Sequence, residues 1–155
     1  MSMINEEEQH RRDWPDLDRE RDQNQFAEYV QLHTIEDKVM SRDDEKKILE
    51  AGLTRFGLDF REARGILLSV ASEREIALVS HVEHHIGTFL QQVAKRERVS
   101  RQDFNKAAML YRKMANDSIS DINIRGRIKQ MIENQGWTGR RGHWLLGSKR
   151  WYKKI

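Results

Sequence analysis

The chain contains no cysteine among its 155 residues. This absence excludes disulfide bonds, thiolate zinc sites, iron–sulfur clusters and cysteine nucleophiles together. No apolar run approaches the roughly 18 residues that span a bilayer, which argues against a transmembrane segment. The polar N-terminal stretch also lacks the apolar core of a signal peptide. We therefore expect a cytoplasmic protein.

Motifs that cradle phosphates or present nucleophiles are also missing. The sequence has no Walker-type loop, no nucleophile elbow and no dinucleotide-binding fingerprint. The frequent acidic residues occur mainly in the first turns of expected helices or in the N-terminal stretch, and none forms a recognisable catalytic pair. We therefore expect a protein that is not an enzyme and that needs no cofactor.

Charge is distributed unevenly along the chain, although the formal net charge is only +3. Residues 1–24 contain eight acidic residues and four arginines, a net charge of −4. Residues 25–124 are almost neutral, at −1, whereas residues 125–155 reach +8. A basic tail of this kind favours an electrostatic partner. The alternative is that the acidic residues fold back over the basic tail of the same molecule.

The pattern of apolar residues predicts a mainly α-helical fold. We expect a flexible acidic arm over residues 1–24, interrupted by Pro15, and a compact bundle of five or six helices over residues 25–136. The longest helix is expected at about 73–97 and the last at about 119–134. Five pairs have the spacing of a helix-capping motif: Ser41 with Asp44, Asp59 with Glu62, Ser72 with Glu75, Ser100 with Asp103, and Ser118 with Asp121.

Two segments of the chain echo each other. SRDDEKKILEAGL at Ser41 and SRQDFNKAAMLYR at Ser100 share serine, arginine, aspartate and lysine in register, which an internal duplication would produce. Residues 40–67 also contain a capped helix, an FGL turn and a second helix with an acidic cap. This segment resembles the helical units of tellurite-resistance-B-like domains. The resemblance implies a helical fold, without the metal-binding carboxylates of that family.

The C-terminal segment, residues 137–155, changes character. Its glycines disfavour a helix, and the two short aromatic runs 143–146 and 150–154 are separated by three residues that include Gly147. This arrangement predicts a basic β-hairpin packed on the bundle. The segment resembles the end of a winged-helix domain, which implies a DNA-binding wing and favours DNA over RNA. The residues that carry this resemblance are Gly136, Trp137, Arg140, Arg141, Gly147, Arg150 and Tyr152.

The tail therefore contains the predicted nucleic-acid site, because cations can neutralise phosphates and aromatic rings can stack on bases. The predicted contacts are Arg140, Arg141, Trp144, Lys149, Arg150, Trp151, Lys153 and Lys154. Alternatively, the tryptophans anchor the tail to the helices while the cations face solvent. A helical adaptor whose tail docks on a partner protein is the second functional interpretation, and binding to a membrane surface is a third. The sequence does not define the oligomeric state.

A histidine cluster forms the remaining candidate site. His81 and His85 are one helical turn apart, so both imidazoles can reach one metal ion, with His33 as a conceivable third ligand. The spacing differs from that of zinc peptidases. We expect structural or surface histidines here and no bound metal, and keep His81 and His85 as candidates for a metal site or a pH-sensitive patch.

Overall fold

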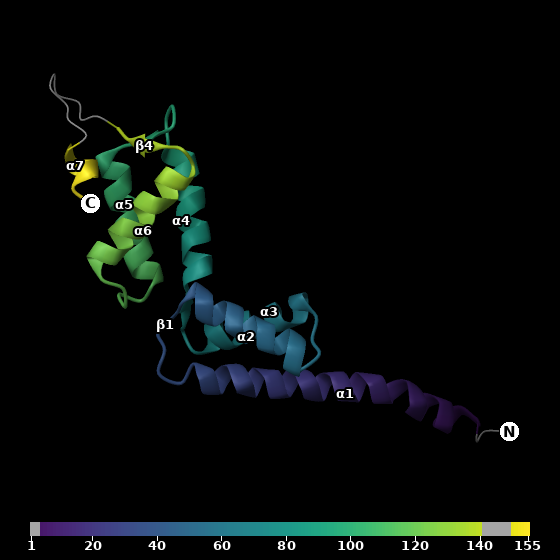
Figure 1. The fold of residues 1–155 in the computed structure, drawn as a ribbon. Coiled ribbons are helices and arrows are strands. Elements are labelled where there is room, and N and C mark those ends of the chain that lie inside the picture. Colours follow the sequence, from purple (N-terminus) through teal and green to yellow (C-terminus); the bar gives the residue numbers. More distant parts are fainter. Residues whose placement is uncertain (1–3, 141–149) are drawn as a thin grey trace. The chain divides into compact units, whose positions relative to one another are not determined.

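The computed structural model describes residues 4–140 and 150–155, with side chains from residue 17 onward. Helices make up most of this part of the chain, and the four strands have two residues each. The fold is therefore mainly α-helical, as predicted (Figure 1). The backbone separates into two compact units, Met1–Ile76 (unit 1) and Ala77–Ile155 (unit 2). The sequence had predicted one bundle over residues 25–136, and this range is divided between the two units.

Unit 1 consists of three helices and one short strand. Its elements are α1 (Ile4–His33), β1 (Val39–Met40), α2 (Arg42–Arg55) and α3 (Phe60–Glu73). Phe26 and Val30 of α1 are fully buried, together with Ala63 and Leu67 of α3. Gly52 lets α2 pack closely against α3, because a Cβ atom at position 52 would lie 2.9 Å from the Cβ of Ala63.

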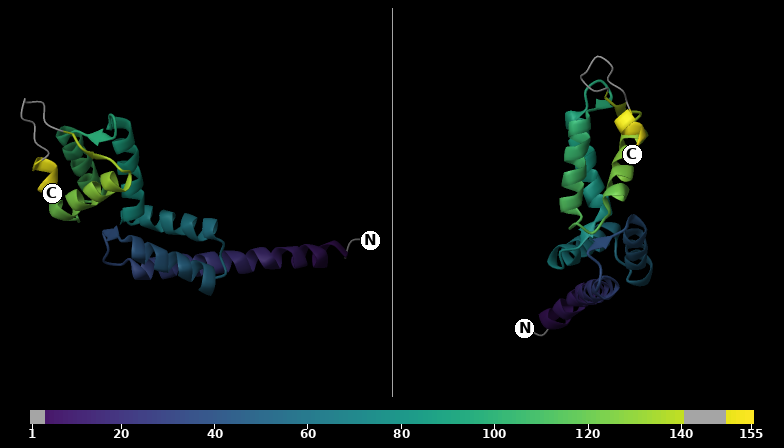
Figure 2. Two further views of the ribbon diagram at one scale, coloured as in Figure 1. Left: turned by 45° about the horizontal axis from the view of Figure 1, so that its top comes forward. Right: turned by 90° about the vertical axis from the view of Figure 1, so that its left-hand side faces the viewer.

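The first helix begins much earlier than the sequence suggested. We expected a flexible arm as far as residue 24, whereas α1 runs from Ile4 through Pro15 to His33, and its N-terminal part extends beyond α2 and α3 (Figures 1 and 2). Arg19 donates two hydrogen bonds of 2.7 Å to the Glu62 carboxylate, and Gln23 donates a third to the same group. These hydrogen bonds connect α1 to α3 at residues that we had assigned to the flexible arm.

Unit 2 contains the remaining elements. They are β2 (Ala77–Leu78), α4 (Val79–Val93), β3 (Arg98–Val99), α5 (Arg101–Met114), α6 (Asp121–Asn134), β4 (Thr138–Gly139) and α7 (Arg150–Lys153). Ile86, Phe104, Tyr111 and Ile128 are fully buried where α4, α5 and α6 pack together. The strands β3 and β4 pair in parallel, with Arg98 opposite Thr138.

Three of the five predicted caps are confirmed. The side chains of Ser41, Asp59 and Ser100 each accept a hydrogen bond from the backbone N–H three residues later. The pair Ser72 and Glu75 is wrong, because α3 continues to Glu73 and α4 begins only at Val79, without a side-chain cap.

The fifth predicted cap is displaced by two residues. Ser120 caps α6 in place of Ser118, whose hydroxyl donates to the Asn116 carbonyl oxygen within the preceding turn. A serine can satisfy a nearby turn as readily as a helix end, so capping patterns alone do not separate the two uses.

The echo between the Ser41 and Ser100 segments coincides with a repeated structure. The order strand–helix–helix occurs as β1–α2–α3 and as β3–α5–α6, and all four helices have 14 residues. In both repeats the second helix, α3 or α6, ends in the same turn. The N–H of Ile76 donates to the Ala71 carbonyl oxygen, and the N–H of Trp137 donates to the Ile132 carbonyl oxygen. The turns also share a residue with positive φ, Glu75 or Gly136.

The second strand of the predicted C-terminal hairpin is a helix instead. Residues 150–154 were expected to be extended, but Arg150–Lys153 form the short helix α7. The other expected strand, 143–146, lies outside the described residues. In the part of the chain that is described, each helix is too short or too polar to cross a membrane.

Candidate nucleic-acid interface

The two units carry opposite charge. Residues 1–76 contain 12 basic and 19 acidic side chains, a net charge of −7. Residues 77–155 contain 16 basic and six acidic side chains, a net charge of +10. Of this charge, +8 comes from the last 31 residues and +2 from residues 77–124. Several kT of positive potential are expected around a unit of this size and charge.

A tight turn after α4 positions three of these cations. The backbones of Lys95 and Arg98 exchange two hydrogen bonds, of 3.0 and 3.2 Å. The central residues, Arg96 and Glu97, both have positive φ, at 51° and 59°, as in a type I′ turn. Neither residue is a glycine or an asparagine, so the sequence gives little indication of this turn.

The parallel pairing of β3 with β4 brings a fourth cation to the same place. The N–H of Thr138 donates to the Glu97 carbonyl oxygen at 3.1 Å, and the N–H of Arg140 donates to the Val99 carbonyl oxygen at 2.7 Å. Arg140 is thereby held beside the turn. A hollow of about 430 Å³ results, which we call the basic hollow; it is lined by Lys95, Arg96, Arg98 and Arg140.

The cations of the basic hollow face solvent. All four side chains are exposed, and within the described residues none of them has a carboxylate partner. Other arginines of unit 2 do have such partners: Arg127 lies 3.0 Å from Glu83, and Arg125 lies 2.7 Å from Asp121. Glu97 shares the turn but does not line the hollow. The arrangement can accept a polyanion without first breaking an ion pair.

Aromatic side chains anchor the end of the tail on unit 2. Tyr152 is buried, and its hydroxyl lies 3.5 Å from the carbonyl oxygen of Lys129. Gly139 lies directly against this ring, because a Cβ atom there would be 2.7 Å from Tyr152 Cγ. Burial, with the nearby Glu133 carboxylate as a second cause, raises the pKa of Tyr152 to about 12, so the phenol is neutral at physiological pH.

The predicted tail residues therefore have different environments. Trp151 packs against Phe104, with ring centroids 5.6 Å apart, and its indole donates to the Arg140 carbonyl oxygen at 3.2 Å. These contacts agree, for Trp151, with the alternative in which the tryptophans anchor the tail to the helices. The cations Arg140, Arg150, Lys153 and Lys154 are exposed. Arg141, Trp144 and Lys149 lie outside the described residues.

The histidine cluster contains one close pair. The Nε2 atoms of His81 and His85 are 3.0 Å apart, on an exposed face of α4. His33, the suggested third ligand, belongs to unit 1, where its ring packs on Tyr29 and its Nδ1 lies 2.8 Å from the Tyr29 carbonyl oxygen. Among the residues that the structure describes, no group of three or more potential metal ligands is present.

Sequence reasoning missed the turn of the basic hollow. Lys95, Arg96 and Arg98 belong to a segment whose overall charge is almost neutral, and only the pairing of β3 with β4 connects them to Arg140. The signal in the sequence is the run KRER directly after a helix. No known family, no curated protein and no solved structure matches the chain significantly.

Proposed function

We propose that this protein is a small, non-enzymatic nucleic-acid-binding or accessory protein, and that unit 2 makes the contacts. The single observation that carries the proposal is the basic hollow, where four exposed cations converge without a carboxylate partner among the described residues. Lys/Arg contacts to phosphates release condensed counterions, which favours binding whatever the base sequence. The net charge of +10 on unit 2 adds long-range attraction to the same polyanion.

The tail extends this surface in the proposal. Lys153 and Lys154 are exposed on and just after α7, which Tyr152 and Trp151 fix to unit 2. Arg140 belongs both to the predicted tail and to the basic hollow. Phosphates of one strand can therefore contact the hollow and the end of the chain.

A charge-reversal experiment tests this function. Binding of labelled duplex DNA and single-stranded RNA to the full chain is measured by fluorescence anisotropy at several salt concentrations. For Arg96→Glu with Arg98→Glu, we expect at least a tenfold loss of affinity. The slope of log affinity against log salt should also fall by about 0.9 for each lost contact to a DNA duplex and by about 0.7 for a single strand.

The matched control places the same change of charge elsewhere. Lys46 and Lys47 are exposed on α2 of unit 1, at 75% and 74% of their side-chain surface. Reversing both to glutamate changes the net charge of the molecule equally but leaves the basic hollow intact. Equal losses of affinity in the two double variants would reduce the effect to net charge and overturn the proposed site.

The adaptor interpretation makes a different prediction. If the tail docked on a protein groove through its tryptophans, affinity for that partner would depend weakly on salt. Trp151 is already packed on Phe104 and hydrogen-bonded to Arg140, which does not favour docking through this side chain.

A further inference from the structure

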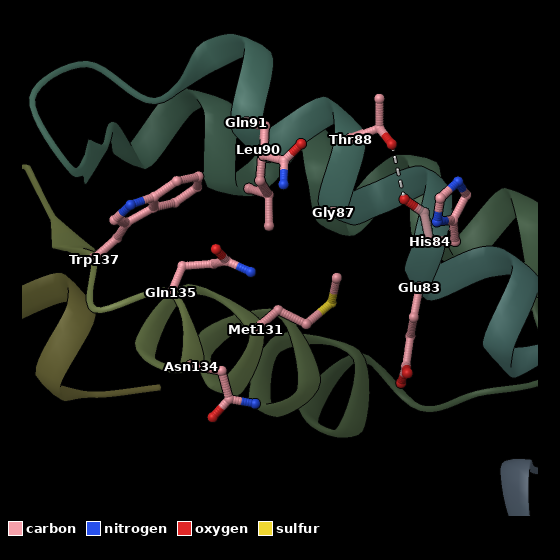
Figure 3. Close-up of a pocket in the computed structure, with 10 residues that line it drawn as sticks. All are labelled: Glu83, His84, Gly87, Thr88, Leu90, Gln91, Met131, Asn134, Gln135 and Trp137. Carbon is pink, nitrogen blue, oxygen red and sulfur yellow. Dashed lines mark hydrogen bonds between the residues drawn. The ribbon is translucent and has the colours of Figure 1, made fainter.

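Unit 2 contains a second pocket besides the basic hollow. It lies between α4 and α6 and has a volume of about 280 Å³. Figure 3 shows Trp137 at one end of this space, with the amides of Gln91 and Gln135 extending into it. Met131 and Leu90 supply apolar surface, and Asn134 also lines the pocket, with its carboxamide pointing away from the space in Figure 3. We call this space the amide pocket.

The side chains of the amide pocket suit a nucleobase. A base has apolar faces, which an indole or a thioether can contact, and an edge that presents both hydrogen-bond donors and acceptors. Carboxamides carry donors and an acceptor in one plane, so they can pair with either kind of group on a base edge. The volume lies just below the roughly 300–1,000 Å³ of pockets for drug-sized ligands, as expected for one ring system.

The pocket is open to a ligand and holds little unbalanced charge. Gln91, Asn134 and Gln135 are exposed, and Trp137 is half-buried. The one carboxylate that lines the pocket, Glu83, accepts a hydrogen bond of 3.0 Å from Arg127. A neutral base can therefore enter without meeting an uncompensated negative charge.

The amide pocket and the basic hollow share one stretch of backbone. Trp137 directly precedes β4, whose Thr138 pairs with Arg98 of the turn, and Arg140 directly follows β4. Trp137 and Arg140 are three residues apart, so the extended chain between them covers about 10 Å. A strand of several nucleotides can span this distance, so one bound strand can place a base beside Trp137 and phosphates near Arg98 and Arg140.

We propose that the amide pocket binds an unpaired base of a nucleic-acid strand whose phosphates lie on the basic hollow. This inference rests on the proposed function and makes it more specific, since a base can enter the pocket only when it is not paired in a duplex. The same chemistry is present in a free nucleotide, so the test must distinguish a strand from a mononucleotide.

The test compares labelled probes of equal length on the full chain: a single-stranded oligonucleotide, the same backbone with abasic sites, and a duplex. We expect the single strand to bind at least tenfold more tightly than the abasic strand, as stacking of one base on an aromatic side chain can provide. In Trp137→Leu this advantage should disappear, while the affinity for the abasic strand remains unchanged. Millimolar free nucleotide should compete only if a base and one phosphate are sufficient for binding.

A second variant protects the test against misfolding of Trp137→Leu. Gln91→Ala combined with Gln135→Ala changes two exposed side chains of the pocket, and we expect a similar loss of preference for the single strand. Gln92→Ala is the matched control, because Gln92 is the exposed neighbour of Gln91 on α4 but does not line the pocket.

The outcomes separate the two proposals. Equal affinity of the wild-type chain for the single strand, the abasic strand and the duplex would overturn the base pocket and leave the proposed function intact. A preference for the single strand that survives both pocket variants would also overturn it. Absence of binding to all three probes would overturn the proposed function and, with it, the base pocket.

Discussion

Glycine is required at two close approaches within the units, and the surrounding atoms show why. At Gly139, an added Cβ would lie 2.7–2.9 Å from three carbon atoms of Tyr152. At Gly52, it would lie 2.9 Å from Ala63 and 3.0 Å from Phe26. By contrast, an added Cβ at Gly126 would have no neighbour within 4 Å. The same residue type is therefore a packing requirement at some positions and a weakness of the helix at others.

Gly139→Ala should destabilise unit 2, because buried Tyr152 cannot move away without losing its own packing. We expect a loss of about 1–3 kcal/mol in the free energy of unfolding, measured by urea denaturation. Gly126→Ala in α6 is the control and should stabilise by about 0.5–1 kcal/mol, since alanine restricts the unfolded chain and favours the helix. An unchanged stability of Gly139→Ala would contradict the close contact with Tyr152.

Glu45 is a buried carboxylate with incomplete pairing. It is 5% exposed, one oxygen lies 3.4 Å from Arg64, and the other has no hydrogen-bond partner among the residues that the structure describes. Its counterpart in the repeated unit is the fully buried Phe104. Burial of a charge with imperfect partners costs free energy that an apolar side chain of similar size avoids.

We expect Glu45→Met to leave the stability of the protein unchanged or to increase it. Arg64→Met should instead lower the free energy of unfolding by about 1–3 kcal/mol, because the buried carboxylate then loses its cation. Thermal and urea unfolding of both variants measure the difference. If Glu45→Met is destabilised and Arg64→Met is not, the buried Glu45 carboxylate stabilises the fold and our interpretation is wrong.

At the scale of elements, Asp121 connects two helices of unit 2. It pairs with Arg112 of α5 and, at 2.7 Å, with Arg125 of its own helix α6. The hydrogen bond from Arg125 lowers the pKa of Asp121 from its ordinary value of 3.8, and the charges of Arg125 and Arg112 act in the same direction. The pairing therefore stabilises the fold only while the carboxylate is ionised.

The sign of the pH dependence follows from the lowered pKa. The contribution of Asp121 is complete above its unfolded pKa of 3.8 and is lost as the pH falls through the lower, folded value. Asp121→Asn should reduce stability at pH 7 by less than about 1 kcal/mol, since the pair is exposed to solvent. The variant should also have a smaller loss of stability in acid than the wild type. Urea unfolding from pH 7 to pH 2.5 tests this, with Asp117→Asn in the preceding turn as the control.

At the scale of the whole molecule, the separation of charge is the dominant feature. Unit 1 carries −7 and unit 2 carries +10, and residues 1–16 of unit 1 contain five acidic residues and two arginines, a net charge of −3. Negative charge on the same molecule opposes the approach of a polyanion, and this repulsion is long-ranged when the salt concentration is low.

Replacing Glu6, Glu7 and Glu8 with glutamine should therefore strengthen binding of nucleic acid. The gain should be several-fold at about 10 mM salt, where the Debye length is about 30 Å, and should vanish at about 1 M. Anisotropy titrations at both salt concentrations measure it. This variant tests whether the acidic residues oppose binding without changing the fold. Deletion of residues 1–24 would also remove the contacts of Arg19 and Gln23 with Glu62. Weaker binding at low salt would contradict the electrostatic argument.

Deletion of residues 137–155 is similarly unsuitable as a test of the tail. It would remove β4 and the buried Tyr152 together with the cations, so a loss of binding could reflect a loss of structure. Reversal of Lys153 and Lys154 to glutamate changes only exposed side chains. These substitutions leave the anchor of Tyr152 and Trp151 in place.

The sequence by itself determined the helical class and three of the helix starts, because a cap and an apolar stripe involve residues only three or four positions apart. The caps at Ser41, Asp59 and Ser100 are of this local kind. Two other capping patterns failed, at Ser72 and Ser118, where the packing of the helices and turns set the boundaries.

Only the tertiary structure decided where charge collects and where a ligand can enter. The turn with Arg96 and Glu97 at positive φ lacks the usual turn residues, and Arg140 reaches it through a parallel strand pair between distant segments. The amide pocket likewise requires α4 and the end of α6 to lie opposite each other. Such contacts depend on the closure of long loops around a core, and no local pattern in the sequence encodes them.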